Sequence, residues 1–322
     1  MKTIVRNRFG PPEVLELQEA AKPDVAHDGV LVRVRACSLN PADWYAVAGK
    51  PWIARPMTGL RGPKDSAVTT DFAGTVEAVG ADVTEFRAGD EAFGRSDSFV
   101  EYLSFSESEP VVVKAATATF EEAAALPVAA STALQALRDH AQVRPGQKVL
   151  INGASGGVGT FAVQIAKAFG AEVTAVCSTR NVEQARALGA DHVVDYTRDD
   201  FTRSDRRYDV MLDIAGSRSW RACKRVLTRD ATVVLVGGPR KSRLLGPLGH
   251  LAAVRLAALR SSRKVVFFVA KLNKGDLTAL RELLEAGKVT PVIDKRYELR
   301  EVADAFRYLG EGHARGKVVV SV

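Results

Sequence analysis

The chain has few cysteines, and those it has are far apart. Cys37, Cys177 and Cys223 are the three cysteines among 322 residues, and no two stand at the short spacing of a metal-binding pair. Isolated thiols in odd number exclude a disulfide framework and indicate a reducing compartment. Aromatic residues are also scarce, at 7%, and form no RNA-binding signature.

Long apolar runs are absent as well. No stretch approaches the ~18 apolar residues of a membrane-spanning helix, and the first six residues lack the apolar core of a signal peptide. We therefore expect a cytoplasmic protein. The 45 Lys and Arg against 38 Asp and Glu leave a net charge of +7, without a lysine-rich tail. Anionic small molecules explain this surplus as well as nucleic acid does, so no nucleic-acid partner is predicted.

What the chain does have is apolar content, at 46% of residues, and enough length for two domains with a cleft between them. The first hundred residues predict short strands. Apolar and polar residues alternate over 30–36, and the pattern resumes over 74–80 after a Pro- and Gly-rich insert at 49–63. This part of the chain is expected to be β-rich.

From about residue 120 onward, predicted strands alternate with helical stretches. This alternation is typical of a parallel sheet with helices on both faces, so we predict an α/β fold. The tail holds a helix from Asp276 and a closing strand, and it can join either domain. The strands predicted in this half are 148–152, 172–177, 192–195, 208–213 and 231–237.

A glycine-rich turn follows the strand that ends at Asn152. Aligned on its last glycines, the run 153–159 is a dinucleotide-binding fingerprint that opens a helix. Gly156 lets the backbone approach a pyrophosphate, Gly159 lets helix and strand pack closely, and the helix N-terminus supplies N–H donors. A purely structural glycine turn is the alternative. Gly237, at the end of the last predicted strand, is a further expected cofactor contact.

The end of the second strand bears on the choice between the two nicotinamide cofactors. An NAD enzyme usually places Asp or Glu there to bind the ribose hydroxyls. This chain has Ser178, Thr179 and Arg180 instead, so no carboxylate in this stretch repels a 2′-phosphate. Two hydroxyls can donate to the phosphate and the guanidinium can pair with it, which predicts NADPH. Alternatively, Arg180 is an exposed helix-start residue that pairs with Glu183.

A basic segment without acidic residues runs from Pro239 to Lys264. Its apolar residues fall near helical spacing, so one face of a helix is apolar and its ends are basic. A solvated helix that covers the cleft or a subunit contact is the favoured interpretation, and a helix on a membrane surface is the second. The positions on that face are Leu248, Leu251, Ala252, Arg255, Leu256 and Leu259.

Several stretches along the chain are similar to motifs of one enzyme family. They are 38–43 (SLNPAD), 71–76 (DFAGTV), 88–94 (AGDEAFG), the glycine turn, 188–196 (LGADHVVDY) and 312–317 (GHARGK). Together they resemble the medium-chain dehydrogenase/reductase superfamily, in its zinc-free quinone oxidoreductase branch. The runs 153–164 and 312–317 resemble the reticulon-interacting mitochondrial NADPH oxidoreductase group. The resemblance implies a GroES-like catalytic domain from 1–122 and 268–322, a Rossmann NADP-binding domain from 123–267, and a homodimer formed through sheet edges.

The resemblance also implies which residues hold the cofactor. The residues form three sets, which are given at the end of this paragraph. The first set would contact the pyrophosphate, the second the adenosine end of the cofactor, and the third would close over the cofactor from the C-terminal tail. The hydroxyl of Tyr196 would reach the 2′-phosphate; the alternative is an ordinary half-buried tyrosine at a strand end. The alternative for the tail set is a surface turn. In order, the sets are Ser155, Gly157 and Val158; Ser178 and Tyr196; and His313, Ala314 and Arg315.

The same motifs show whether the usual metal ligands of the superfamily are present. Zinc enzymes of the superfamily use a Cys in the first motif and a His-Glu pair in the second, so that the metal acts as a Lewis acid. Here Asn40 stands at the Cys position and Thr70-Asp71 at the His-Glu position. No cysteine between 38 and 176 remains to hold a structural zinc, so we expect no metal. Thr69 replaces the family's glycine before Asp71, so that loop departs from the pattern.

Without a metal, carbonyl reduction needs hydrogen-bond donors aimed at the oxygen that gains charge. Asn40 is the first candidate, because its position faces the nicotinamide in the family, and Tyr45 is the second. Both can instead be structural, since an Asn before Pro41 can set a turn. Quinones and conjugated enones suit such a site because their product anion is delocalised, and water can supply the proton.

We therefore predict an NADPH-dependent reductase of quinones or other conjugated carbonyls. Two other functions stay open. One is an NAD(P)-dependent alcohol dehydrogenase or carbonyl reductase, against which the missing metal ligands argue. The other is an NADPH-binding regulatory or interaction protein with little turnover.

Overall fold

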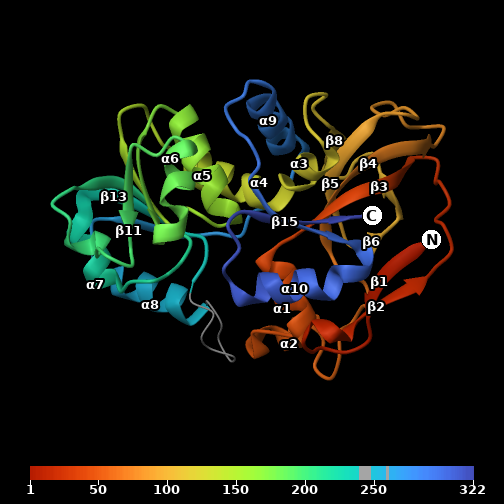
Figure 1. Ribbon diagram of the computed structural model, residues 1–322, viewed down its shortest axis with the longest axis horizontal. Helices are drawn as coiled ribbons and strands as arrows, with labels where there is room; N and C mark the ends of the chain where they lie inside the picture. Colours follow the sequence, from red (N-terminus) through yellow and green to blue (C-terminus); the bar gives the residue numbers. More distant parts are fainter. Residues whose placement is uncertain (239–247, 259–260) are drawn as a thin grey trace. The chain divides into compact units, whose positions relative to one another are not determined.

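Two large sheets, one mixed and one wholly parallel, organise the chain (Figure 1). The computed structural model describes residues 1–238, 248–258 and 261–322. Each large sheet belongs to its own unit of the chain, which confirms the predicted α/β architecture of a β-rich domain and a doubly wound parallel-sheet domain. Unit 1 comprises residues 1–131, 271–287 and 291–322, and unit 2 comprises residues 132–270 and 288–290.

Unit 1 is built on a seven-stranded sheet in the order β15-β16-β3-β4-β5-β8, with β7 paired to β3, and on a small sheet β2-β1-β6. The long strand β3 (Gly29–Leu39) pairs antiparallel with β4 (Thr70–Val79) and also with β16 (Lys317–Ser321). The two ends of the chain therefore share one sheet. The other strands are β1 (Lys2–Arg6), β2 (Leu15–Glu19), β5 (Glu91–Ser96), β6 (Phe99–Val100), β7 (Tyr102–Ser106), β8 (Val111–Val113) and β15 (Ile293–Glu298).

Some helices of unit 1 begin and end at capping residues, as α1 and α10 illustrate. Helix α1 starts after Asn40 with Pro41 in its first turn and ends at Gly49, whose φ of 62° suits glycine. Helix α10 buries Val302, Phe306 and Leu309 on one face. The helices are α1 (Pro41–Ala48), α2 (Arg55–Thr58), α3 (Phe120–Ala124), α4 (Pro127–Gln135, which crosses into unit 2), α9 (Lys274–Glu285) and α10 (Val302–Glu311).

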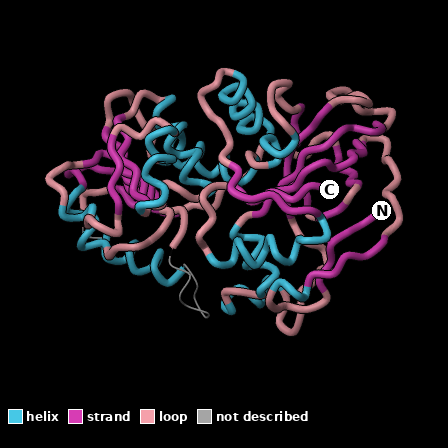
Figure 2. The backbone as a smooth tube through the Cα atoms, in the orientation of Figure 1, coloured by secondary structure: helices cyan, strands magenta, loops and turns pink. Residues whose placement is uncertain are grey.

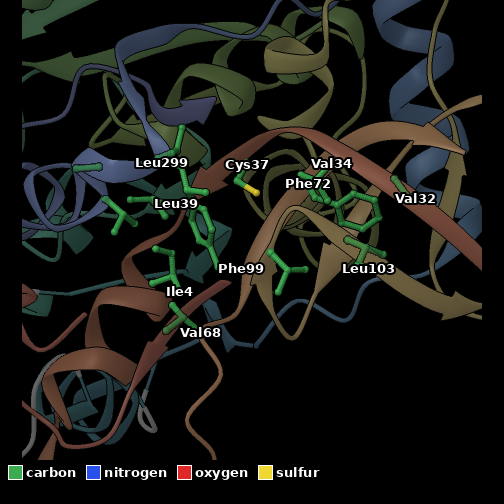
Figure 3. Close-up of a cluster of buried hydrophobic side chains, with 14 of the residues drawn as sticks. Ile4, Val32, Val34, Cys37, Leu39, Val68, Phe72, Phe99, Leu103 and Leu299 are labelled. Carbon is green, nitrogen blue, oxygen red and sulfur yellow. The ribbon is translucent and has the colours of Figure 1, made fainter. Parts of the chain in front are cut away.

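The core of unit 1 follows from the alternation seen in the sequence. In β3 the side chains of Val32 and Val34 are buried while Arg33 between them is exposed. Figure 3 shows these valines among apolar side chains of neighbouring strands, such as Phe72 of β4 and Leu103 of β7. Burial of each such side chain stabilises the fold by roughly 1.5–3 kcal/mol.

Unit 2 is a parallel sheet in the order β11-β10-β9-β12-β13-β14, drawn as adjacent strands in Figure 2. The order reverses between β9 and β12, and ligands of such sheets bind outside the carboxyl ends of the strands at this reversal. The sequence analysis did not predict the edge strand β14, because it has only four residues and begins at the last residue of the basic segment. The strands are β9 (Lys148–Asn152), β10 (Glu172–Cys177), β11 (His192–Asp195), β12 (Tyr208–Asp213), β13 (Leu227–Leu235) and β14 (Lys264–Phe267).

The helices of unit 2 include one from the basic segment. Helix α8 buries Leu251, Val254 and Ala258 in the core of its own unit, whereas Leu256 is 68% exposed. The rest of the segment, 239–247 and 259–260, lies outside the described residues. No helix in the described part of the chain is long and apolar enough to cross a membrane. The helices are α5 (Gly157–Ala168), α6 (Val182–Ala187), α7 (Trp220–Cys223) and α8 (Leu248–Ala258).

Hydrogen bonds explain where the chain passes between the units. Ser38 donates to the carbonyl of Ala124 at 2.7 Å, so the chain just beyond residue 122 belongs to unit 1. Gln164 of α5 both accepts from the backbone N–H of Thr290 and donates to its carbonyl, at 2.8 and 3.0 Å, which ties 288–290 to unit 2. The functions assigned to the two domains stay predictions.

The three thiols are expected to be unreactive in the folded protein. Burial raises the pKa of Cys177 to about 11 and that of Cys223 to about 12, and it raises the pKa of Cys37 as well. Because the thiolate is the reactive form, Ellman's reagent at pH 8 should label native protein about 100-fold more slowly than denatured protein. Rapid labelling of one full equivalent in the native state would contradict this expectation.

Candidate functional site

The glycine turn of unit 2 leaves backbone donors exposed at a helix start. Strand β9 ends at Asn152, and α5 begins at Gly157 after the extended residue Gly156, which is its N-cap. The first bond of the helix runs from the N–H of Thr160 to the carbonyl of Gly156 at 2.9 Å. Because the N-cap is glycine, no side chain satisfies the N–H groups of the first turn, which are then suited to bind an anion.

Two glycines of this turn differ in the space around them. A Cβ on Gly159 would lie 2.1 Å from the carbonyl oxygen of Gly153 and 2.7 Å from the Cα of Ala154. A Cβ on Gly156 would find no atom closer than 4.0 Å. Gly159 is therefore required for packing of helix against strand, whereas Gly156 borders open space that a diphosphate can occupy.

The carboxylate of Asp195, which the sequence analysis did not single out, lies beside the residues that follow β10. Thr179 donates to Asp195 at 2.6 Å, and Thr197 donates to the other oxygen of Asp195 at 2.8 Å. The hydrogen bond from Thr179 is the main reason that the pKa of Asp195 is lowered. Asp195 ends β11, in register with Cys177 of β10, so only the pairing of the strands brings it here. The hydroxyl of Thr179 thus already donates to Asp195. Of the two hydroxyls expected to donate to a 2′-phosphate, those of Ser178 and Thr179, only that of Ser178 keeps this role.

The other residues expected at the adenosine end lie around this carboxylate. Ser178 is partly buried, and its hydroxyl accepts from Asn181 at 3.2 Å. Arg180 is exposed. Tyr196 is 54% exposed, and its backbone N–H donates to the carbonyl of Cys177 at 3.0 Å. Its contact with a 2′-phosphate stays a prediction, as does the alternative of a half-buried tyrosine at a strand end.

The carboxyl edge of the sheet in unit 2 carries a second polar group that the sequence did not reveal. Asn152 at the end of β9 donates to Asp213 at the end of β12, at 2.7 Å, and to Ser217 at 3.1 Å. Asp213 also accepts from the N–H of Gly216 at 2.9 Å, and its carbonyl accepts from Gly237 at 3.4 Å. These bonds hold the loops that follow β9, β12 and β13. The sequence did contain a signal for this contact, because Asn152 and Asp213 are polar residues that each end a predicted strand.

In unit 1, Asn40 lies at the centre of a buried polar cluster. Its backbone N–H donates to Asp43 at 2.7 Å, and its side-chain N–H donates to Asp71 at 2.8 Å. Its amide oxygen accepts from the amino group of Lys317 at 2.6 Å. Asn40 is 3% exposed and Lys317 is 2% exposed. One amide hydrogen of Asn40 has no acceptor among the described residues.

Arg95 of β5 completes this cluster with a second cation. Its guanidinium donates to Asp43 at 2.8 Å and to Asp71 at 3.2 Å. Burial raises the pKa of Asp43, although Arg95 opposes this effect, and burial lowers the pKa of Lys317 against the attraction of Asp71. Two carboxylates and two cations therefore balance one another inside unit 1. Sequence reasoning missed both Arg95 and Lys317.

The remaining predicted site residues also lie in unit 1. Tyr45 in α1 is partly buried, and its ring meets that of Trp44 edge to face at a centroid distance of 5.3 Å. His313, Ala314 and Arg315 form the turn between α10 and β16. His313 is exposed, and the backbone N–H of Arg315 donates to Asp294 at 2.8 Å.

Comparison with known proteins decides the family. Family models described as "Alcohol dehydrogenase GroES-like domain" and "Zinc-binding dehydrogenase" match residues 26–135 and 188–320. The human NAD(P)H oxidoreductase RTN4IP1, mitochondrial, is 33% identical over 356 residues, covering 100% of this chain and 89% of the relative. The chain belongs to the quinone-oxidoreductase-like branch of the medium-chain dehydrogenase/reductase superfamily. The resemblance seen in the sequence, the GroES-like domain included, is thereby confirmed.

Two further proteins similar to this medium-chain reductase show the breadth of the branch. The NADPH-dependent alkenal/one oxidoreductase, chloroplastic, of Arabidopsis thaliana is 32% identical over 336 residues, covering 99% of this chain and 79% of the relative. The solved structure of the quinone oxidoreductase from Coxiella burnetii aligns with a TM-score of 0.84 and 30% identity, over 100% and 99% of the two chains. The names of the relatives include chloroplastic and mitochondrial, so a cytoplasmic location stays a prediction.

The residues at the family's metal position do not fit a zinc ion. Asn40 and Asp71 are bound to each other, and Lys317 and Arg95 place two cationic groups beside them. Neither Asn nor Thr70 is a usual zinc ligand, and nearby cations disfavour a divalent metal. In the described parts of the chain, no three His, Cys, Asp or Glu side chains gather as a ligand set. Absence of zinc stays a prediction, which elemental analysis tests.

Proposed function

We propose that this medium-chain reductase is an NADPH-dependent enzyme that reduces quinones or other conjugated carbonyls without zinc. The observation that carries this proposal is the buried cluster in which the amide of Asn40 is bonded to Lys317 and Asp71, with Arg95 paired to Asp71. We propose that this cluster takes the place of the metal of zinc relatives. Relatives named quinone oxidoreductase and alkenal/one oxidoreductase support the substrate class.

The cofactor would be held by the turn at 153–159 and by the end of β10. The bound cofactor supplies the hydride. The N–H groups of Gly157, Val158 and Gly159, with Ser155 and Gly156, would bind the diphosphate, and Gly237 lies at the same sheet edge. Unit 2 contains roughly twice as many Lys and Arg as Asp and Glu, which favours a polyanionic ligand.

Selection of NADPH would depend on Arg180, Tyr196 and Ser178, because Thr179 already donates to Asp195. The guanidinium of Arg180 would pair with the 2′-phosphate, and the hydroxyls of Ser178 and Tyr196 would donate to it. In unit 1, His313, Ala314 and Arg315 are proposed to contact the cofactor from the tail, as in the family.

The chain's own contribution to catalysis would come from hydrogen bonds. Asn40 has one amide hydrogen left for the substrate oxygen, and Tyr45 is the second proposed donor. Such donors stabilise the charge that develops on the oxygen without a metal. A conjugated carbonyl needs less of this help than a simple ketone does, because its product anion is delocalised. Water would supply the proton.

A homodimer is part of the proposal. Strand β14 lies at one edge of the six-stranded sheet, and an edge strand presents backbone groups that a second copy can pair with. Light scattering coupled to size-exclusion chromatography measures the mass; a monomer at all concentrations would remove the dimer.

The activity test follows NADPH oxidation by purified protein with a panel of quinones and enones. Turnover supports the proposal. Turnover only of simple alcohols with NADP⁺ would indicate an alcohol dehydrogenase, and tight NADPH binding without turnover would indicate a regulatory protein.

Cofactor choice can be tested separately by substitution. We expect Arg180→Asp to raise the KM for NADPH about tenfold or more while changing that for NADH little, because only NADPH carries the 2′-phosphate. Tyr196→Phe should act in the same direction. The matched control is Arg186→Asp, since Arg186 is exposed and pairs with Glu183 at 2.6 Å. Equal losses with both cofactors would remove the phosphate role from these residues.

A further inference from the structure

Lys317 occupies a position for which the proposed function gives no role so far. It is the first residue of β16, which pairs antiparallel with β3, and the register sets Val318 opposite Leu39. This pairing carries Lys317 to Asn40, although 277 positions separate them. Its amino group is buried, 2.6 Å from the amide oxygen of Asn40 and 3.5 Å from a carboxylate oxygen of Asp71.

The partners of Asn40 allow only one orientation of its amide. Lys317 can only donate, so it requires the oxygen of the amide, and ionised Asp71 can only accept, so it requires the nitrogen. If the amide were flipped, its NH₂ group would face the amino group of Lys317 and its oxygen would face a carboxylate. Lys317 and Asp71 together therefore fix which way the remaining amide hydrogen points.

Lys317 also changes the strength of Asn40 as a donor. A cation at the amide oxygen withdraws electron density from the amide, and hydrogen bonds in a chain polarise one another most strongly where water is excluded. Burying an amino group is unfavourable unless it is paired. The amino group of Lys317 is paired both with the uncharged amide of Asn40 and with the carboxylate of Asp71.

We infer that Lys317 is a positioning residue for the reaction: it holds the amide of Asn40 in the orientation that presents an N–H to the substrate oxygen and strengthens that donor. This inference rests on the proposed function, in which Asn40 is the donor. Lys317 itself touches neither substrate nor cofactor in this scheme.

A double-mutant cycle tests the coupling. We expect Lys317→Met and Asn40→Ala each to lower kcat with a quinone about 10- to 100-fold, and the double variant to be no slower than the slower single variant. The KM for NADPH should change little, since the diphosphate is bound by the turn of unit 2. Losses of kcat that simply multiply in the double variant would overturn the inference. Lys288→Met, at an exposed lysine, is the control.

Loss of folding must be separated from loss of positioning. In the part of the chain that the structure describes, Lys317→Met leaves two buried carboxylates with Arg95 as their cation, so a companion variant, Lys317→Met with Asp71→Asn, restores the balance of charge. We expect this companion to recover the melting temperature and to stay slow. If it recovers kcat together with the melting temperature, Lys317 only balances charge and the inference is wrong.

A spectroscopic measurement tests the inference without any turnover. The chain has five asparagines, so selective ¹⁵N labelling gives five side-chain amide pairs, and Asn40→Ala identifies the pair of Asn40. We expect this pair to exchange slowly with solvent in the wild type and at least tenfold faster in Lys317→Met. Unchanged exchange would overturn the inference. Absence of turnover in the wild type would count against the proposed function instead. The asparagines are Asn7, Asn40, Asn152, Asn181 and Asn273.

Discussion

Gly159→Ala should destabilise unit 2 by about 3 kcal/mol and weaken NADPH binding at least tenfold. The added methyl group would lie 2.1 Å from the carbonyl oxygen of Gly153 and 2.7 Å from Cα of Ala154, both backbone atoms. Backbone cannot rotate away as a side chain can, so helix α5 must move off the turn, and overpacking of this kind costs about 1–3 kcal/mol or more. Thermal unfolding and NADPH titration by fluorescence measure the two effects.

Gly156→Ala is the matched control for this prediction. A methyl group there meets nothing within 4.0 Å, and the backbone of Gly156 is extended, so alanine fits the free protein. We expect an unchanged melting temperature together with weaker NADPH binding, because the methyl group would occupy the space proposed for the diphosphate. Normal melting of Gly159→Ala would contradict the packing argument, and normal NADPH affinity of Gly156→Ala would place the diphosphate elsewhere.

Arg95→Met should destabilise unit 1 by about 3–5 kcal/mol. The substitution removes the guanidinium that bridges Asp43 and Asp71 and leaves two fully buried carboxylates for which Lys317 is the one remaining cation among the described residues. An uncompensated buried charge has a cost of this size. The melting temperature should fall by about 10 °C. Arg87→Met, at an exposed arginine of the same unit, is the control and should melt as the wild type does.

The pH dependence of the Arg95→Met defect has a definite sign. Burial already raises the pKa of Asp43, and loss of Arg95 removes the main opposing influence, so the pKa rises further in the folded variant. A raised pKa in the folded state means that the folded form is favoured at low pH and loses stability as pH rises through that pKa. The difference in melting temperature between variant and wild type should therefore be larger at pH 8 than at pH 5. A difference that grows on acidification would exclude this cause.

The features that sequence reasoning found are those that depend on neighbours along the chain. The strand at 148–152, the turn and the start of α5 form one continuous stretch, so glycine spacing and apolar periodicity suffice to predict them. Asn40 was found because a family motif surrounds it. Strand β14 was missed because a strand of four residues, the first of which still belongs to the basic segment, carries too little periodic signal.

The features that sequence reasoning missed depend on sheet pairing between distant segments. Asp195 reaches Thr179 only because β11 pairs in register with β10. Arg95 and Lys317 reach the Asn40 cluster from β5 and β16. Lys317 ends the family motif at 312–317, but the motif alone does not show that its amino group reaches Asn40.

The amino-acid sequence by itself determined the two-domain α/β organisation, the glycine-rich turn before α5 and the lack of the usual zinc ligands at Asn40 and Thr70, because each depends on local spacing and residue type. Only the tertiary structure decided what surrounds Asn40 and which hydroxyls are free at the end of β10. Burial makes the difference: a charge inside the protein must find an opposite charge or a dipole, and the strand register alone settles which distant side chain supplies it.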